Sequence, residues 1–185
     1  MDRFEERERL AAIIEAESIR RGNFTLASGK TSDYYLDCRR TTLHAEGAVL
    51  VGRLGLAAMQ ESGWAADAVG GLTLGADPIA TAISMTSQMS GTPMHAFLVR
   101  KAVKGHGTGQ KIERCPEAGS SVVVVEDVVT SGGSLIQAVD ACRDAGLVVA
   151  GALAIVDREE GGEAAIRARD LPYVALYTAS ELLGR

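Results

Sequence analysis

The residues best suited to chemistry lie in one stretch, 121–134, with the sequence SVVVVEDVVTSGGS. Its four consecutive valines favour an extended backbone, and no polar residues alternate with them. We therefore expect a strand covered on both faces, as in a parallel sheet. Two carboxylates, Glu126 and Asp127, follow the valines. The hydroxyl and glycine residues from Thr130 to Ser134 then lead into a helical pattern that stops at Gly146.

This order of residues predicts a site for a ligand that contains both phosphate and ribose. A loop between a strand and a helix presents free backbone N–H groups at the helix N-terminus, where phosphate binds. Gly132 and Gly133 permit close backbone approach, and the neighbouring hydroxyls add donors. The two acids would repel a bare phosphate and suit sugar hydroxyls or a divalent metal. The alternative interpretation is an ordinary strand, turn and helix with surface acids.

Two other phosphate-binding motifs do not match. A P-loop requires Lys after its last glycine, where this chain has Ser134, and the G-x-G-x-x-G dinucleotide fingerprint is absent. The stretch instead resembles the phosphoribosyl-diphosphate (PRPP) motif of the type I phosphoribosyltransferases: a hydrophobic strand, two acids, two apolar residues and Thr-x-Gly. The resemblance implies PRPP contacts from Glu126, Asp127, Val128, Val129, Thr130, Ser131, Gly132, Gly133 and Ser134.

Composition limits the class of protein. The chain has 185 residues, 46% of them hydrophobic and 23% charged, with a net charge of −5. These values predict one globular domain, residues 1–185, without a nucleic-acid-binding surface. The charged N-terminus and the lack of a long apolar run predict no signal segment and no membrane span. Three scattered cysteines are expected to be reduced thiols of a cytoplasmic protein, without a zinc site.

The N-terminal region predicts a helix followed by a hairpin. Residues 3–20 form an amphipathic pattern, and Gly22 is expected to end the helix. The segment 24–37 turns at its Ser-Gly-Lys-Thr-Ser centre, which predicts two hairpin arms with Tyr34 and Tyr35 as core or lid residues. The string also resembles the N-terminal hood of the orotate phosphoribosyltransferase family. That resemblance implies a hood, built from about residues 1–40 and the C-terminal segment, that covers the base.

A second glycine loop, 70–78, follows a short strand at 66–71 and precedes a helix. We expect Asp77 as the N-cap of that helix and Pro78 in its first turn. The loop is either a second anion site or a tight connection. Its sequence resembles the family's pyrophosphate loop, which favours the anion site.

Positive charge gathers in the segment 100–114, where five basic residues face one acid. A long glycine-rich loop with a charge of +4 predicts a lid that closes over an anionic substrate; the alternative is a solvated surface loop. The segment resembles the family's catalytic loop. The resemblance implies a homodimer in which Lys101 reaches the other chain's site, with Arg100, Lys104 and His106 around the diphosphate.

Arg158 follows an apolar strand at 147–156, and an Arg at the carboxyl end of a parallel strand faces the ligand crevice. Its segment resembles the one whose Arg pairs with the carboxylate of orotate, so Arg158, with Thr130, is expected to contact the base. A guanidinium matches a carboxylate fork to fork. The alternative is a surface ion pair with Glu159 or Glu160.

Three positions depart from the family pattern. Ala27 and Leu74 stand where many members have Lys, and Gly105 stands where several have Asp. Lys30 is a candidate substitute for the first, and loop amides for the second. An acid/base role at Gly105 is not carried over.

The remaining pattern alternates helices and strands, which predicts an α/β domain with a mainly parallel central sheet. Helices are expected at 44–61, 79–88, 135–145 and 163–169 and from 180, and further strands at 94–99 and 173–177. Together the motifs imply the type I phosphoribosyltransferase fold, and a reaction that joins orotate to PRPP to give orotidine 5′-phosphate and diphosphate. Mg²⁺ is the expected cofactor, held mainly through PRPP, with water bridges to Glu126 and Asp127.

Two alternative functions remain at this point. One is a phosphoribosyltransferase for another base. The other is a PRPP-sensing regulator without catalysis, a class that usually carries a nucleic-acid-binding module, which this sequence lacks.

Overall fold

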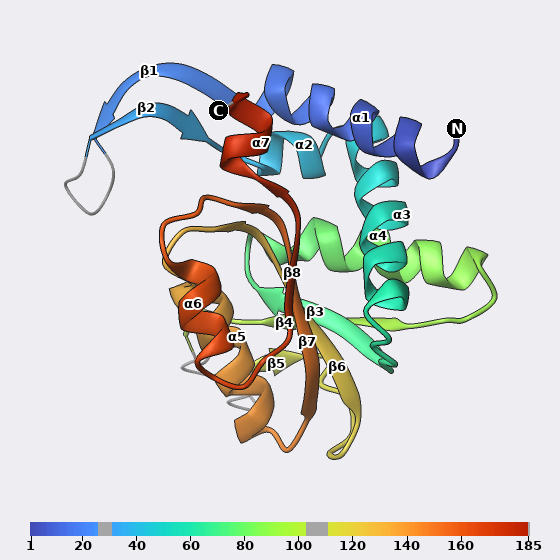
Figure 1. Cartoon of the computed structure of the whole chain (residues 1–185). Coiled ribbons are helices and arrows are strands. Elements are labelled where there is room, and N and C mark those ends of the chain that lie inside the picture. Colours follow the sequence, from blue (N-terminus) through green and yellow to red (C-terminus); the bar gives the residue numbers. More distant parts are fainter. Residues whose placement is uncertain (26–30, 103–110, 185) are drawn as a thin grey trace.

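The valine run forms the middle of the sheet in the computed structural model, which describes residues 1–25, 31–102 and 111–184. The strands of this sheet, in spatial order, are β5 (Ile112–Glu113), β4 (His95–Val99), β3 (Ala68–Leu72), β6 (Ser121–Val129), β7 (Val148–Asp157) and β8 (Tyr173–Thr178). All neighbours pair in parallel except β5, which runs antiparallel to β4 (Figure 1). The expected mainly parallel sheet is therefore confirmed.

Helices cover both faces of β6, which explains why its sequence does not alternate. The helical segments are α1 (Arg3–Ile13), η1 (Ile14–Ser18), α2 (Arg39–Thr42), α3 (Ala45–Glu61), α4 (Ala76–Met89), α5 (Gly133–Asp144), α6 (Gly162–Arg167) and α7 (Ala179–Leu183). Val123 and Val125 pack with α1, α3 and α4, whereas Val122 and Val124 pack with α5. All four valines are 0% exposed. Each such burial contributes about 1.5–3 kcal/mol.

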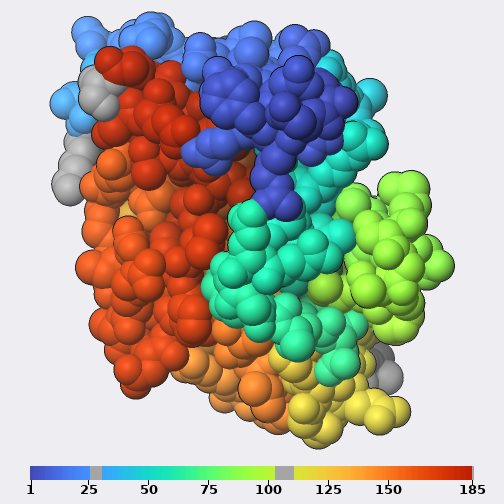
Figure 2. Space-filling view, turned by 45° about the vertical axis from the view of Figure 1, so that its right-hand side comes forward, coloured from blue at the N-terminus to red at the C-terminus, as the bar shows by residue number. Residues whose placement is uncertain are grey.

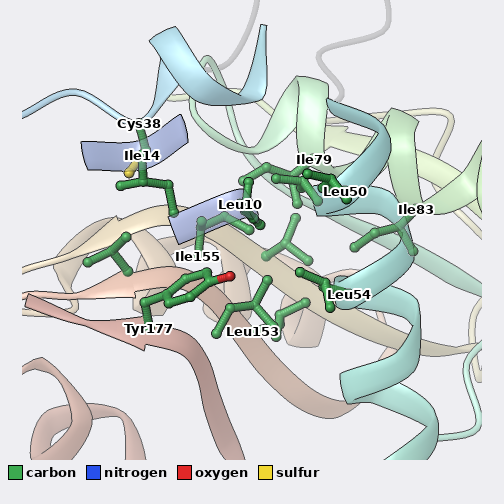
Figure 3. Close-up of a cluster of buried hydrophobic side chains, with 14 of the residues drawn as sticks. Leu10, Ile14, Cys38, Leu50, Leu54, Ile79, Ile83, Leu153, Ile155 and Tyr177 are labelled. Carbon is green, nitrogen blue, oxygen red and sulfur yellow. The ribbon is translucent and has the colours of Figure 1, made fainter. Parts of the chain in front are cut away.

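The larger hydrophobic cluster joins the N-terminal helix to the sheet. Figure 3 shows Leu10 of α1, Leu50 of α3 and Ile79 of α4 gathered over Leu153 and Ile155 of β7. This packing fixes α1, α3 and α4 against the sheet, so the strand ends beneath them have a defined position.

The first hairpin consists of β1 (Ile19–Thr25) and β2 (Thr31–Leu36), paired antiparallel. It lies beside α1, α2 and α7 at one end of the sheet (Figure 1). The N-terminal helix α1 is bound to β8, because the Arg7 guanidinium donates to the carbonyl of Leu176 and Tyr177 Oη donates to the carbonyl of Arg7 at 2.7 Å. Figure 2 shows the dark blue N-terminal helix lying against the red C-terminal segment.

Two helix boundaries were predicted wrongly, the end of the first helix and the start of α4. The first helical segment ends at Ser18, and Gly22 lies inside β1 at φ +153°, where the register with β2 shifts between Arg21 and Phe24. Pairing with β2 satisfies this backbone in place of the helix. The second glycine loop is shorter than expected, so α4 begins at Ala76 and Asp77 lies within its first turn, not at its N-cap.

Two elements have no counterpart in the sequence interpretation, because both are short. The four-residue α2 follows Cys38, and the two-residue β5 adds to the edge of β4. Cys38 and Cys142 are buried, Cys115 is exposed, and all three are free thiols. Among the helices of the described residues, none has the length and apolar character needed to cross a membrane.

Leu153→Ala is expected to lower the free energy of unfolding by about 2–5 kcal/mol, because it removes a fully buried side chain from the larger cluster. Chemical denaturation measures the change. Val148→Ala on the same strand is the matched control, since Val148 is 57% exposed; its cost should stay below about 1 kcal/mol. Equal losses from the two variants would contradict this assignment of the core.

Candidate functional site

Three loops leave the same edge of the sheet. They follow the carboxyl ends of β3, β6 and β7, which are neighbouring parallel strands. Ligands of open α/β sheets bind at this edge. The chain therefore brings together the glycine loop after Leu72, the hydroxyl loop after Val129 and the turn that begins with Arg158.

The hydroxyl loop lines a cavity of about 230 Å³. Gly132 is its key backbone position, with φ +82° as the N-cap of α5 and no side-chain cap. The first amides of a helix lack intrahelical partners, and the helix dipole adds positive potential there. The lining residues are Glu126, Val128, Val129, Thr130, Ser131, Gly132, Gly133, Ser134 and Leu135. Every residue from the expected PRPP motif except Asp127 lines this cavity.

A second cavity of about 270 Å³ adjoins the first. It is lined by Tyr35, Leu36, Asp37, Arg39, Leu72, Thr73, Leu74, Gly75, Lys101, Glu126, Asp127, Val128 and Ser134. Glu126, Val128 and Ser134 line both cavities. The two hollows are thus halves of one site, separated by the end of β6.

Glu126 and Asp127 are part of the strand end and not of the loop, since β6 continues to Val129. Glu126 is 6% exposed, and its Oε2 is buried without a hydrogen-bond partner among the residues that the structure describes. Burial, followed by the hydrogen bond and the charge of Asp127, raises the pKa of Glu126 far above its ordinary value; nearby Lys101 opposes this. Asp127 Oδ1 accepts from the backbone N–H of Val128 at 2.9 Å.

The glycine loop presses against these two acids. A Cβ on Gly75 would lie 2.5 Å from Asp127 Oδ1 and 2.8 Å from Glu126 Oε1, so a larger residue does not fit. Leu74, which stands where family members carry Lys, is 68% exposed beside the cavity. The loop therefore contributes backbone and an apolar side chain to this half of the site.

The basic segment divides between the site and the surface. Lys101 lines the second cavity of its own chain. The expectation that it reaches the other chain's site stays a prediction. Arg100 instead pairs with Glu113 of β5, with its Nε donating to Oε1 at 2.7 Å. Lys104, Gly105 and His106 lie outside the described residues, as do Ala27 and Lys30 of the hairpin turn.

Arg158 is buried, with a side chain that is 7% exposed, and it lines neither cavity. Its guanidinium lies over the Tyr34 ring, 4.7 Å from the centroid, and its Nε donates to Glu160 Oε1 at 2.9 Å. The ion pair with Glu160 considered from the sequence is present. However, the cation also reaches the hairpin, with Nη2 at 3.5 Å from Ser32 Oγ.

The turn that carries Arg158 is held by its neighbours. Tyr173 Oη donates to Asp157 Oδ2 at 2.8 Å, and the Glu159 N–H donates to Asp157 Oδ1 at 2.7 Å. Glu159 adopts φ +61° and accepts from the Ser180 N–H at the start of α7, which lowers the pKa of its carboxyl group. Arg158 is thus fixed beside the hairpin by contacts to β8 and α7.

Several residues of this site were not found from the sequence. Asp37 and Arg39 line the second cavity, and Ser32 contacts Arg158. An acid two residues before an Arg, directly after the hairpin, was the available signal for the first pair. Neither motif spacing nor periodicity indicates the long-range contact of Ser32 with Arg158.

Comparison with known proteins gives this fold and site a class. Residues 63–170 match the family model described as phosphoribosyl transferase domain. That match spans β3 to α6 and includes both cavities' main loops. The chain belongs to the phosphoribosyl transferase domain family.

Relatives narrow the class. The orotate phosphoribosyltransferase of Rhodopirellula baltica is 48% identical over 91% of this chain and 90% of its own length, and that of Aquifex aeolicus is 46% identical over 96% and 98%. The crystal structure of the Mycobacterium tuberculosis orotate phosphoribosyltransferase with Fe(III) dicitrate has a TM-score of 0.85 and 42% identity over 96% of this chain and 98% of its own. Within the wider family, the chain belongs to the orotate phosphoribosyltransferases.

Glu126→Gln is expected to raise the free energy of unfolding of the ligand-free protein, and more so as the pH rises. Between the ordinary value of 4.5 and the raised folded pKa, the unfolded carboxyl is ionised while the folded one keeps its proton. The native protein therefore loses up to about 1.4 kcal/mol per pH unit in that window, and the glutamine variant does not. Denaturation at pH 5, 6.5 and 8 measures the difference.

The matched control is Glu117→Gln, which removes an exposed carboxylate. Its effect should be small at every pH. A gain for Glu126→Gln that does not change with pH would show that Glu126 is ionised in the folded protein.

Proposed function

We propose that this chain transfers the phosphoribosyl group of PRPP to orotate, giving orotidine 5′-phosphate and diphosphate in pyrimidine biosynthesis. The observation that carries the assignment is the pair of adjoining cavities that share Glu126, Val128 and Ser134. One cavity offers helix amides and hydroxyls, and the other contains cationic side chains. PRPP has the matching form, with a monophosphate and a diphosphate at opposite ends of one ribose.

The substrate is placed by matching charge to charge. The 5′-phosphate takes the amides of Thr130 to Ser134 at the start of α5, where the dipole favours an anion. The ribose hydroxyls take the carboxylates of Glu126 and Asp127, which stand between the cavities. The diphosphate then falls in the second cavity, beside Lys101 and the backbone of Thr73 to Gly75. PRPP as the ligand is supported by a structural relative at TM-score 0.79, the M. tuberculosis orotate phosphoribosyltransferase in complex with PRPP.

In the reaction, a ring nitrogen of orotate forms a bond to the anomeric carbon and loses its proton to solvent or to the departing diphosphate, while the bond from that carbon to the diphosphate oxygen breaks. The electron pair of the broken bond leaves with diphosphate, and the sugar passes through an oxocarbenium-like state. Catalysis consists mainly of stabilising the departing polyanion by fixed donors. We assign this role to Lys101 together with Arg100, Lys104 and His106 of the basic segment.

The acids fit a divalent metal of the kind that PRPP carries. Among the described residues, Glu126 Oε2 is a buried oxygen without a hydrogen-bond partner, and Asp127 lies beside it. Two carboxylates plus substrate oxygens are a common environment for Mg²⁺. Within the described residues, no group of three or more His, Cys, Asp or Glu could hold a metal by itself. Glu126 and Asp127 would therefore hold Mg²⁺ together with PRPP, and the ion would supply charge neutralisation at the diphosphate.

Base recognition falls to Arg158 and Tyr34. The carboxylate of orotate matches the guanidinium fork, and Glu160 supplies the carboxylate that occupies it in the free protein. Arg158 N–H donates to the carbonyl of Val129 at 2.8 Å, which places this residue next to Thr130. Orotate would thus bind where the hairpin of β1 and β2 lies next to the hydroxyl loop.

A homodimer is supported by an apolar patch on α3 and α4. Val49, Met85 and Met89 are 53%, 62% and 78% exposed, and together they border a hollow of about 150 Å³. Exposed apolar patches of this kind mark interaction sites, and most soluble oligomers are symmetric copies of one chain. In such a dimer we expect Lys104 and His106 to contribute to the partner's site, as the family resemblance implies.

The three free thiols support a cytoplasmic location for the enzyme.

Lys101→Ala is expected to lower turnover about a hundredfold, or ~3 kcal/mol, with a smaller effect on the affinity for PRPP. The reason is that Lys101 acts on charge that develops as diphosphate leaves. Orotate consumption with PRPP and Mg²⁺, followed by absorbance, measures both parameters. Wild-type turnover in this variant would contradict the role of Lys101.

A mixing experiment shows whether Lys101 acts in the site of its own chain or in the site of the partner chain. Because Lys101 lines the cavity of its own chain, Lys101→Ala and Asp127→Asn should damage the same site, and mixed dimers of the two should stay inactive. Recovered turnover would instead show that Lys101 serves the partner chain.

Arg158→Gln is expected to raise KM for orotate by about tenfold or more, since a charge-assisted hydrogen bond contributes about 1.5–3 kcal/mol, while KM for PRPP changes little. Arg158→Lys should recover only part of the loss, because it keeps the charge without the fork. Arg167→Gln removes an exposed arginine of α6 and is the control. An unchanged KM for orotate in Arg158→Gln would contradict this assignment. So would a panel of acceptor bases in which another base is turned over faster than orotate.

A further inference from the structure

A cation that the reaction scheme above does not use lies at the start of α2. Arg39 is its first residue, and its Nε and Nη2 donate to the two carboxylate oxygens of Asp37 at 2.8 and 3.0 Å. The Arg39 side chain is 48% exposed and that of Asp37 is 23% exposed. The guanidinium is therefore held at one edge and open to solvent at another.

Arg39 shares the second cavity with Lys101 and the glycine loop. Lys101 and Arg39 are the cationic residues of that lining, whereas the first cavity has no Lys or Arg among its described residues. Arg39 also lies within electrostatic reach of Asp127, whose charge contributes to raising the pKa of its guanidinium after the larger effect of Asp37. The positive charge of the site is thus concentrated in one cavity.

The geometry of the pair leaves donors for a ligand. A guanidinium has five N–H groups, and the fork to Asp37 uses two of them, one on Nε and one on Nη2. The backbone N–H of Arg39 also donates to Asp37 Oδ1 at 3.3 Å, which helps to hold the carboxylate in place. An oriented arginine loses less side-chain freedom on binding a phosphate than a free one.

We propose that Arg39 is a substrate-binding residue that contacts the diphosphate end of PRPP from the α2 side of the second cavity. Asp37 orients it. This inference rests on the proposed function, because the second cavity receives the diphosphate only if PRPP binds across both cavities. It assigns to the hairpin side of the molecule a role in holding the leaving group in addition to covering the base.

The adjacent arginine provides a matched control. Arg40 has the same side-chain exposure, 48%, but its Nε donates to the carbonyl of Glu17 at 2.6 Å and its Nη2 pairs with the Glu17 carboxylate. It does not line the second cavity. Arg39→Gln and Arg40→Gln therefore remove the same group from neighbouring positions, one inside the site and one outside it.

The test compares steady-state kinetics with direct binding of inorganic diphosphate by calorimetry, with and without Mg²⁺. For Arg39→Gln we expect KM for PRPP and Kd for diphosphate to rise by about tenfold or more, with less than about twofold change in KM for orotate. Arg39→Lys should recover part of the affinity, and Arg40→Gln should match the wild type. Unchanged diphosphate binding in a folded Arg39→Gln protein would overturn the inference.

Asp37→Asn separates direct contact from a purely structural role. If Arg39 contacts diphosphate, Asp37→Asn keeps the guanidinium and loses only its orientation, so it should cost less affinity for PRPP than Arg39→Gln does. If Asp37→Asn reproduces the loss seen in Arg39→Gln, the ion pair only shapes the loop and the proposal is wrong. Wild-type protein that does not turn over PRPP and orotate would refute the proposed function itself, whereas an active wild type with an unaffected Arg39→Gln refutes only the role of Arg39.

Discussion

The site depends on two carboxylates held side by side at the end of a strand that has no water on either face. Glu126 and Asp127 continue a run of fully buried valines, so their side chains leave the core only at the edge of the sheet. Burying a carboxyl group is costly unless it is neutralised or paired. Burial raises the pKa of Glu126, and Lys101 lies close enough to oppose this shift. Sugar hydroxyls could donate hydrogen bonds to the same carboxyl oxygens.

Much of this arrangement could be predicted from sequence because it is local. The valine run, the acids and the glycines before α5 lie within 15 consecutive positions, and strand, loop and helix follow from propensity and spacing. The same holds for α3, which was expected from His44 onward and begins at Ala45 with His44 as its N-cap. Where neighbours along the chain decide the conformation, the pattern was sufficient.

The misses have a different physical origin. Gly22 has the character of a helix terminator, but the strand partner that recruits it comes about ten residues later. Asp77 is a good N-cap by type; the backbone after Leu72 turns sooner because Gly75 must pack against the acids of another strand. Arg39 enters the site only because the hairpin folds over the sheet. Each of these outcomes is set by tertiary contacts that single-sequence reasoning does not contain.

The two halves of ligand recognition are assembled from very different spans of chain. The cavity proposed for the 5′-phosphate is lined within residues 126–135, whereas Arg158, proposed to bind the base, contacts Ser32 and Tyr34 of the hairpin and lies in a turn tied to β8 and α7. Closing such long loops is slow compared with forming a strand and its following helix. During synthesis, the proposed phosphate-binding loop could therefore fold early. The proposed base-binding site would form only after about the last thirty residues had been made and the N-terminal and C-terminal segments had packed together, so selectivity for the base would come last.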